Sequence, residues 1–329
     1  MNKMKAVLQT EFGGVETLYI GETAMPALSE NEVLIEVHYA ALNRADLLQR
    51  KGKYPPPKGE SEILGLEASG IVKQVGKNVK HFTPGDRVMT LLAGGGQAEY
   101  VKADQRLVMH IPDSLTLEQG AAIPEVFLTA NQALFFEGKT KFGSTVLIHA
   151  GASGVGTSAI QLAKARGCRV ICTASAAKHA TCKNLGADLI IDYKTQDFAS
   201  VVKEFTKNQG VSIILSFIGA PNFERNLDCL AVDGTLMLIA TMGGVTIEAF
   251  NIRPILTKRL KIQGTTLRAR SNAYKQELIQ AFSADFLPDL ASGKITPIID
   301  SVLDWKDIQQ AHQRMEANKN VGKIVLKVK

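Results

Sequence analysis

Residues 145–164, TVLIHAGASGVGTSAIQLAK, decide the fold of the chain. The stretch begins with the apolar run 146–148, which is typical of a buried parallel strand. A turn of glycines and small residues follows, and a helical pattern starts near Val155. This order favours a dinucleotide-binding unit, because small residues let the backbone approach a pyrophosphate and the N–H groups at a helix start point at its charge.

The glycine pattern of this turn is imperfect. A Gly-x-Gly-x-x-Gly motif would fall on Gly151, Ser153 and Gly156, so that a serine stands where the middle glycine is expected. A glycine-rich turn can also be no more than a tight connection between a strand and a helix. Both interpretations stay open on this stretch alone.

Composition is that of an ordinary globular protein with room for two domains. The 329 residues are 45% hydrophobic and 21% charged, and the net charge is +6. The basic residues are scattered, so we expect a solvated surface rather than a nucleic-acid interface. The N-terminus lacks the apolar core of a signal peptide and no apolar run approaches a membrane span, so we expect no membrane segment and a cytoplasmic location.

The cysteines give no sign of a metal site. There are four, Cys168, Cys172, Cys182 and Cys229, and no two have Cys-x-x-Cys spacing. No cluster of histidine with cysteine suggests zinc. We expect reduced and mostly buried thiols.

Two kinds of pattern divide the chain. Up to about residue 110, short β-branched or alternating runs are separated by turn signals, which predicts a barrel-like β domain. A long connection within it carries Tyr54 beside three prolines, 55–57. From about residue 115, six strands alternate with helices and predict a doubly wound parallel sheet. The six strands are expected at 145–149, 169–173, 189–191, 212–216, 235–239 and 261–266. A helix over 272–291, a helix over 305–316 and a last strand over 322–327 complete the chain, and we expect this tail to rejoin the first domain.

The residues after the second strand of the sheet favour NADPH over NADH. An acidic residue about 20 positions past the glycine turn typically accepts the ribose 2′-hydroxyl of NAD, yet no Asp or Glu lies between Gly156 and Asp188. Ser175 and Lys178 stand there instead, and they would bind a 2′-phosphate. Lys178 could also be only a solvent-facing helix residue. Tyr193 could stack on the adenine or reach the same phosphate, or it could be a half-buried aromatic at a strand end.

A set of motifs in fixed order carries a resemblance over essentially the whole chain. The motifs are ALNRAD at 41–46, QRKGKYPPP at 49–57, ILGLEASG at 63–70, LLAGGGQAEYV at 91–101, AAIPEVFLTA at 121–130, VLIHAGASGVGTSAIQLAK at 146–164 and MEANKNVGKIVL at 315–326. With them the sequence resembles the medium-chain dehydrogenase/reductase superfamily, and within it the zinc-free quinone oxidoreductases that include zeta-crystallin. It is most similar to the tumour-suppressor-inducible quinone oxidoreductase branch. The resemblance implies a GroES-like β-barrel domain, 1–123 with 267–329, and a Rossmann domain, 124–266, with a six-stranded sheet.

The resemblance also indicates metal-free chemistry. Zinc alcohol dehydrogenases of this superfamily place Gly-His-Glu where this chain has Gly65, Leu66 and Glu67, and leucine cannot bind a metal. They also supply a cysteine ligand near 44–46, where this chain has none. Without a Lewis acid, alcohol oxidation is disfavoured, whereas an electron-poor quinone or enone needs no metal for reduction.

The resemblance implies functional residues at the positions of this sequence that match the family's motifs. Ser153, Gly154, Val155 and Gly156 would hold the pyrophosphate, and Ser175, Lys178 and Tyr193 would surround the 2′-phosphate and adenosine. A turn at Thr241, Met242 and Gly243, together with Thr265, Thr266 and Leu267, would flank the nicotinamide. Asn43, Tyr54 and Thr129 would face the cleft, with Tyr54 as a candidate proton donor. Structural alternatives are a turn cap for Asn43, a helix residue bonded to its own backbone for Thr129 and a loop aromatic packed on proline for Tyr54.

We therefore expect an NADPH-dependent quinone reductase that passes hydride directly to a quinone in the interdomain cleft. An enoyl or alkenal reductase with the same cofactor is the first alternative. A non-catalytic RNA-binding or crystallin-like protein is the second, against which the scattered charge argues. By analogy with the family, we expect a homodimer formed through the strand at 260–266.

Overall fold

The structure is a computed structural model that describes residues 2–329. The chain divides into two compact units. One consists of the residues up to Leu128 together with Leu267–Lys329, and we call it the barrel unit; the other is Thr129–Thr266, the sheet unit. No helix in the described part of the chain combines the length and the apolar character that a membrane span requires.

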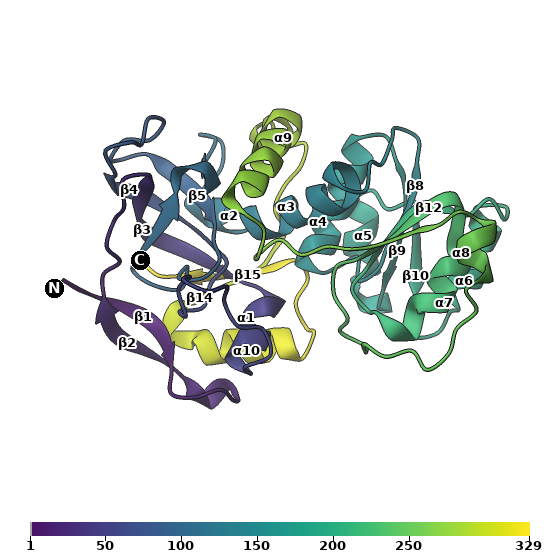
Figure 1. The fold of residues 1–329 in the computed structure, drawn as a ribbon, viewed down its shortest axis with the longest axis horizontal. Coiled ribbons are helices and arrows are strands. Elements are labelled where there is room, and N and C mark those ends of the chain that lie inside the picture. Colours follow the sequence, from purple (N-terminus) through teal and green to yellow (C-terminus); the bar gives the residue numbers. More distant parts are fainter. Residues whose placement is uncertain (1) are drawn as a thin grey trace. The chain divides into compact units, whose positions relative to one another are not determined.

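The sheet unit is built on six parallel strands in the order β10-β9-β8-β11-β12-β13 (Figure 1). The strands are β8 (Thr145–Ile148), β9 (Arg169–Ala174), β10 (Leu189–Asp192), β11 (Val211–Ser216), β12 (Leu230–Leu238) and β13 (Lys261–Gly264). The apolar runs of the inner strands β8, β9 and β11 are buried on both faces, as inner parallel strands require. The predicted doubly wound, six-stranded parallel sheet is confirmed.

Helices cover both faces of this sheet. They are α4 (Gly154–Ala165), α5 (His179–Asn184), α6 (Phe198–Phe205), α7 (Phe223–Cys229) and α8 (Arg253–Thr257). Figure 1 shows α4 and α5 on one side of the strands and α6, α7 and α8 on the other. From β8 to β10 the strands are added in one direction across the sheet, and from β11 to β13 they are added in the opposite direction. Because the crossovers between parallel strands are right-handed, the helices change from one face of the sheet to the other where this direction reverses. Ligands of such sheets bind beyond the carboxyl ends of the strands at this reversal.

The barrel unit contains a seven-stranded sheet and a separate hairpin. The sheet has the order β14-β15-β3-β4-β5-β7, with β6 also paired to β3, and β1 pairs with β2. The strands are β1 (Lys3–Gln9), β2 (Leu18–Ala24), β3 (Glu32–Leu42), β4 (Glu67–Val75), β5 (Arg87–Leu91), β6 (Tyr100–Asp104), β7 (Val108–His110), β14 (Ile299–Asp304) and β15 (Lys323–Lys327). Because β15 pairs antiparallel with β3, the C-terminal tail rejoins the first domain as predicted. The strands β2, β7 and β14 were not predicted, since they are short or mix polar with apolar residues.

Four helices belong wholly to the barrel unit: α1 (Arg44–Arg50), α2 (Leu117–Ala121), α9 (Asn272–Ala291) and α10 (Ile308–Glu316). The bounds of α9 are those predicted. A further helix, α3 (Pro124–Asn131), begins at a proline whose missing N–H suits the first turn. After α3 the chain winds more widely, as a π-helix over 132–136.

Candidate active site

The turn after β8 is closed so tightly that two of its positions require glycine. Ala150 has a left-handed backbone with φ of 50°, and the N–H of Gly151 donates to the carbonyl of Thr173 at 2.9 Å. A Cβ atom on Gly151 would lie 2.9 Å from Cys172 Sγ. A Cβ atom on Gly156 would lie 2.3 Å from the carbonyl oxygen of Ala150, which is closer than real contacts allow. The motif glycines therefore let α4 begin directly against the turn.

Ser153 caps the start of α4. Its Oγ accepts a hydrogen bond from the N–H of Gly156 at 3.0 Å, and its carbonyl accepts from Thr157 at 2.8 Å. The first N–H groups of a helix have no acceptor within the helix. Ser153 already accepts the hydrogen bond of the Gly156 N–H group. The N–H groups of Gly154 and Val155 are therefore the ones that this helix end can offer to a ligand. The structure thus gives the serine at the motif's middle position a structural role, that of an N-cap.

The turn is supported by a buried histidine, His149, which was not predicted as part of the site. His149 Nδ1 lies 3.1 Å from Thr173 Oγ1, and Nε2 lies 2.7 Å from Asn226 Oδ1. Its ring meets Phe198 edge-on at a centroid distance of 4.8 Å. Burial lowers the pKa of His149 to about 4, so the imidazole is neutral at neutral pH. His149 therefore ties β8, β9 and α7 together as an uncharged polar link.

Three predicted nucleotide residues lie where the neighbouring strands β9 and β10 end. Ser175 precedes the short turn Ala176–Lys178, in which the N–H of Lys178 donates to the carbonyl of Ser175 at 2.9 Å. Tyr193 directly follows β10 and is 56% exposed. The next carboxylate along the chain, Asp188, is paired with Lys164 at 2.9 Å. The end of β9 thus carries a hydroxyl and an ammonium group.

The turn predicted beside the nicotinamide follows β12. The N–H of Met242 donates to the carbonyl of Phe217 at 3.0 Å, and the N–H of Gly243 donates to that of Ile218 at 2.8 Å. The carbonyl of Thr241 accepts from the N–H of Gly244 at 3.1 Å and closes the turn. These bonds attach the turn to the segment after β11, at the carboxyl end of the sheet.

The remaining predicted contacts fall in both units. Thr129 and Thr265 are buried residues of the sheet unit, and Thr266 is its last residue and is exposed. Thr265 is fixed by a bond from its N–H to the carbonyl of Leu238 at 3.0 Å. Leu267 begins the C-terminal part of the barrel unit and is buried there.

In the barrel unit, a buried arginine holds Tyr54. The guanidinium of Arg268 donates to the carbonyl of Ala93 at 2.7 Å, to Gln49 Oε1 at 2.6 Å and to the carbonyl of Tyr54 at 3.2 Å. It also lies over the Tyr54 ring at 5.2 Å from the centroid. Burial raises the pKa of Tyr54, and the carboxylate of Glu125 adds to the rise while Arg268 opposes it. The phenol is therefore protonated at neutral pH and can act as a proton donor.

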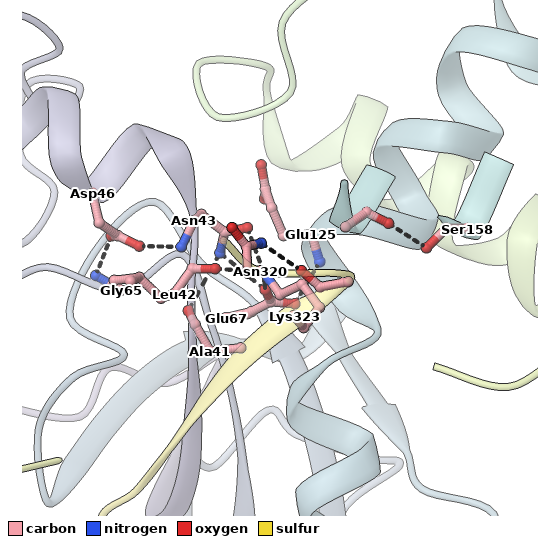
Figure 2. A network of polar contacts seen from close by, with 12 residues as sticks. Ala41, Leu42, Asn43, Asp46, Gly65, Glu67, Glu125, Ser158, Asn320 and Lys323 are labelled. Atoms are coloured by element: carbon pink, nitrogen blue, oxygen red, sulfur yellow. Dashed lines mark hydrogen bonds and ion pairs between the residues drawn. The ribbon is translucent and has the colours of Figure 1, made fainter. Parts of the chain in front are cut away.

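Asn43 belongs to a buried ion-pair network (Figure 2). Its Nδ2 donates to Glu67 Oε1 at 2.9 Å, and its Oδ1 accepts from Lys323 Nζ at 2.6 Å. Lys323 also pairs with Glu67 Oε1 at 2.7 Å and donates to the carbonyl of Leu42 at 2.8 Å. The amide of Asn43 is thus engaged by both charged groups, which favours a structural role for this residue.

Asp46 locks the loop that follows Asn43. Its two carboxyl oxygens accept from the backbone N–H groups of Gly65 at 2.9 Å and Asn43 at 2.7 Å. Burial raises the pKa of Asp46 to about 6, although these hydrogen bonds lower it in part. Gly65 has φ of 106°, and a Cβ there would lie 2.5 Å from the N of Gln97. The turn therefore depends on glycine, and it carries the buried, apolar Leu66.

Glu125 stands at the start of α3 against the same network (Figure 2). Its backbone N–H donates to Glu67 Oε2 at 2.9 Å. Its own Oε2 is buried and has no hydrogen-bond partner among the described residues. Burial, with the nearby Glu67 carboxylate, raises the pKa of Glu125 to about 8. At neutral pH this side chain is mainly an uncharged carboxylic acid.

Four charged residues of the barrel unit were not predicted as members of the site: Glu67, Glu125, Arg268 and Lys323. Glu67 and Glu125 lie inside the motifs ILGLEASG and AAIPEVFLTA, so their positions in those motifs were the available signal. Lys323 likewise lies inside the motif MEANKNVGKIVL. Arg268 lies in none of the motifs, and it meets its partners, which are distant in the sequence, only in the folded unit.

The chain has a parallel sheet with a glycine turn at its switch point, and it has a second, β-barrel unit. These two features define the class of two-domain dinucleotide-binding proteins. Family comparisons agree with this class. Residues 154–284 match the zinc-binding dehydrogenase family, and residues 29–113 match the alcohol dehydrogenase GroES-like domain.

Comparisons with individual proteins extend over the full chain. A quinone oxidoreductase from Lama guanicoe is 30% identical over 99% of this chain and 98% of its own length. A mycobacterial protein solved in complex with NADPH is 32% identical with a TM-score of 0.87, over 99% of this chain and 100% of that one. The CurK enoyl reductase is 27% identical with a TM-score of 0.87, over 99% of both chains. The chain belongs to the medium-chain dehydrogenase/reductase family, with the quinone oxidoreductases, and is an NAD(P)-dependent oxidoreductase.

The zinc implied by one family name does not fit the residues present. Within residues 2–329 no group of three or more His, Cys, Asp or Glu side chains is arranged to hold a metal ion. Leu66 offers no ligand atom, and the oxygens of Asp46 and Glu67 are engaged by backbone N–H groups and by Lys323. The four cysteines are free and buried, as predicted.

Proposed function

We propose that the protein is an NADPH-dependent quinone oxidoreductase that works without a metal. The preference for NADPH rests on one observation: Ser175 and Lys178 follow the end of β9, and the sequence has no carboxylate there. A carboxylate there would repel a 2′-phosphate, whereas a hydroxyl and an ammonium group would bind it. The relative complexed with NADPH and the relatives named quinone oxidoreductase support both parts of the proposal.

The residues of the sheet unit fit the nucleotide. The N–H groups of Gly154 and Val155 would bind the pyrophosphate, and the absence of a side chain at Gly156 keeps the helix start close to the turn. Ser153 would act mainly by holding this helix end in shape. Tyr193 would cover the adenosine, and the Thr241–Gly243 turn, Thr129, Thr265 and Thr266 would lie on the nicotinamide side.

In the barrel unit, Tyr54 would contact the acceptor. Bound NADPH would supply a hydride, so the reduced acceptor also needs one proton. The phenol of Tyr54 keeps its proton at neutral pH, and Arg268 fixes its ring and its backbone. Tyr54 would therefore donate that proton to the acceptor oxygen. Asn43 would keep the loop beside Tyr54 in place through Glu67 and Lys323.

A panel of acceptors tests the proposal. NADPH oxidation by the purified protein should be fastest, by kcat/KM, with naphthoquinones or ortho-quinones. An enoyl or alkenal reductase is the second candidate, because a solved enoyl reductase matches 99% of the chain. A clear preference for 2-alkenals would replace the first candidate by the second.

We also propose a homodimer formed through β13 and a cytoplasmic location. In the described residues, β13 pairs with β12 alone, and its Ile262 is partly exposed, so a second copy could extend the sheet. The four free thiols suit a reducing compartment. Light scattering should give about twice the chain mass of 35.6 kDa; the mass of one chain would contradict the dimer.

A further inference from the structure

Arg268 is a buried cation whose hydrogen bonds reach no carboxylate. It is only 4% exposed. Its side chain donates to three neutral oxygens, namely the carbonyls of Ala93 and Tyr54 and the amide oxygen of Gln49. Burying a charge is costly unless the charge is paired with an opposite one. The positive charge of this guanidinium is therefore not compensated by a direct partner in the described part of the chain.

A second buried cation lies beside Arg268. The ammonium of Lys275, which is 3% exposed, donates to the backbone carbonyl of Arg268 at 2.8 Å. The other buried lysine described above, Lys323, differs because it forms an ion pair with Glu67 at 2.7 Å. Two positive charges thus gather at Arg268, in a setting where little water screens them.

The guanidinium of Arg268 is held against the ring of Tyr54. It lies over the ring at 5.2 Å from the centroid, and it is fixed by its hydrogen bond of 3.2 Å to the carbonyl of Tyr54. A phenol that gives up its proton becomes a phenolate, whose negative charge is shared between its oxygen and its ring. A cation fixed over the ring therefore attracts the phenolate more strongly than the neutral phenol.

We propose that Arg268 stabilises the negative charge that develops on Tyr54 when this residue gives its proton to the reduced acceptor. The inference rests on the proposed function, since it requires an acceptor that takes up hydride and then a proton from Tyr54. Arg268 does not contact the acceptor. It is a positioning residue that also supplies a fixed charge, and it acts through the phenol.

The proton steps balance without a further reactant. The acceptor gains a hydride with its two electrons and becomes an anion. The O–H bond of Tyr54 breaks as a new O–H bond forms on the acceptor, which leaves a phenolate beside Arg268. The phenolate then takes a proton from solvent, which the partial exposure of Tyr54 permits. Arg268 keeps its own protons throughout, because a guanidinium is not deprotonated in proteins.

The other charges of this region leave the guanidinium available to Tyr54. Burial raises the pKa of Tyr54, Glu125 raises it further and Arg268 lowers it, as a cation over the ring should. Burial lowers the pKa of the guanidinium itself, and three acids, Asp46, Glu60 and Glu125, oppose this effect. None of these acids forms an ion pair with Arg268 in residues 2–329, so they act on it only from a distance.

The test separates the charge of Arg268 from its hydrogen bonds. Arg268→Gln removes the charge and keeps a donor, whereas Arg268→Lys keeps the charge. With NADPH and a naphthoquinone, Arg268→Gln should lower kcat at least about tenfold and change the KM for NADPH little. Arg268→Lys should retain more of kcat than Arg268→Gln. The matched control is Arg270→Gln, because Arg270 lies over the ring of Tyr274 at 4.5 Å, and it should behave as wild type.

The acidity of the phenol supplies a readout that a purely structural role would not change. Biosynthetic replacement of tyrosine by 3-fluorotyrosine makes the phenol more acidic, so that a phenolate forms with less help. It should raise kcat of Arg268→Gln roughly fivefold and change wild type and Tyr54→Phe less. Thermal unfolding shows which variants fold. If Arg268→Gln does not fold, Arg268→Met takes its place, because it is also uncharged and keeps a long side chain.

The double variant Tyr54→Phe/Arg268→Gln shows whether the two residues act together. It should be no slower than Tyr54→Phe alone, because Arg268 acts through the phenol. A folded, uncharged variant at position 268 with the kcat of wild type would overturn the proposal. So would a loss of kcat that 3-fluorotyrosine does not restore, or a double variant slowed by the product of the two single effects.

The activity of wild type separates this inference from the proposed function. If wild type turns over neither quinones nor 2-alkenals, the proposed function fails and the role of Arg268 fails with it. If wild type reduces quinones and the uncharged Arg268 variants match it, only this inference fails.

Discussion

At the scale of single residues, the proposed preference for NADPH rests on the side chains at the carboxyl end of β9. Ser175 and Lys178 lie in one short turn, and Tyr193 directly follows the adjacent strand, β10. Three side chains thus gather where the carboxyl ends of two parallel strands meet. Their chemistry suits a phosphate group beside an aromatic ring.

Lys178→Ala should weaken NADPH binding and leave NADH binding unchanged. A charge-assisted contact with the 2′-phosphate is worth about 1.5–3 kcal/mol, which is roughly 10- to 150-fold in Kd. Titration of cofactor fluorescence measures both affinities. Lys183→Ala, an exposed lysine on the following helix, is the control and should behave as wild type. Equal loss of affinity for NADPH and NADH in Lys178→Ala would show that Lys178 does not recognise the 2′-phosphate.

At the scale of elements, two structural features shape the start of α4. Ser153 caps the helix, and Gly156 lets it approach the turn after β8. His149 fixes that turn to β9 and α7 from beneath. The helix end can therefore hold its N–H groups toward a ligand without rearranging.

Gly156→Ala should destabilise the sheet unit and weaken binding of the nucleotide. The new methyl would lie 2.3 Å from a backbone oxygen that cannot move aside, and overpacking of this kind costs about 1–3 kcal/mol. Gly264→Ala is the matched control, because nothing lies within 4 Å of the position its Cβ would take. Thermal unfolding with and without NADPH measures both effects. A Gly156→Ala protein as stable as Gly264→Ala would contradict this account of the turn.

The elements that were predicted from sequence are those with strong local signals. The glycine turn at 145–164 and the alternation of apolar runs with helices predicted the six-stranded sheet, and the bounds of the 20-residue α9 were also predicted. Weak signals were missed: β14 reads IDSVLD, which has no clean alternation. The ion pair of Glu67 with Lys323 could not be predicted either, because the two residues are far apart in the sequence and meet only when β15 pairs with β3.

The residues of the candidate site also divide into those that could be predicted from sequence and those that could not. Residues of the glycine turn and of the strand ends could be named from their position in a known pattern. The candidate-site residues of the barrel unit are distinguished by their burial, which no local sequence pattern reports. The buried Oε2 of Glu125, which has no hydrogen-bond partner among the described residues, is an example. The neutral His149 of the sheet unit is another. Ser153 was predicted as a phosphate contact, and its hydrogen bond to Gly156 adds a cap that the motif alone does not reveal.

At the scale of the whole molecule, stability should depend on pH through Glu125. Its folded-state pKa of about 8 lies above the ordinary value of 4.5, so the native protein binds this proton more tightly than the unfolded chain does. The contribution of Glu125 to stability is therefore fully present below about pH 4.5 and is lost as pH rises toward 8.

The difference in Tm between Glu125→Gln and wild type isolates this effect. The buried His149 and His312 have lowered pKa values and cost stability in acid, but they do so equally in both proteins. Glu125→Gln should gain in Tm relative to wild type as pH rises from about 4.5 to about 8 and should change no further above that. A difference that stays constant over this range would mean that Glu125 is not protonated in the folded protein.

The central claim is that this two-unit oxidoreductase moves hydride from NADPH to a quinone. Steady-state kcat/KM of the purified wild type for NADPH and for NADH, with one naphthoquinone as acceptor, tests it most directly. We predict rapid oxidation of NADPH and a kcat/KM at least about tenfold lower for NADH, because the proposed 2′-phosphate contact would contribute about 1.5 kcal/mol or more. Equal values for the two nucleotides, or no oxidation of either, would contradict it.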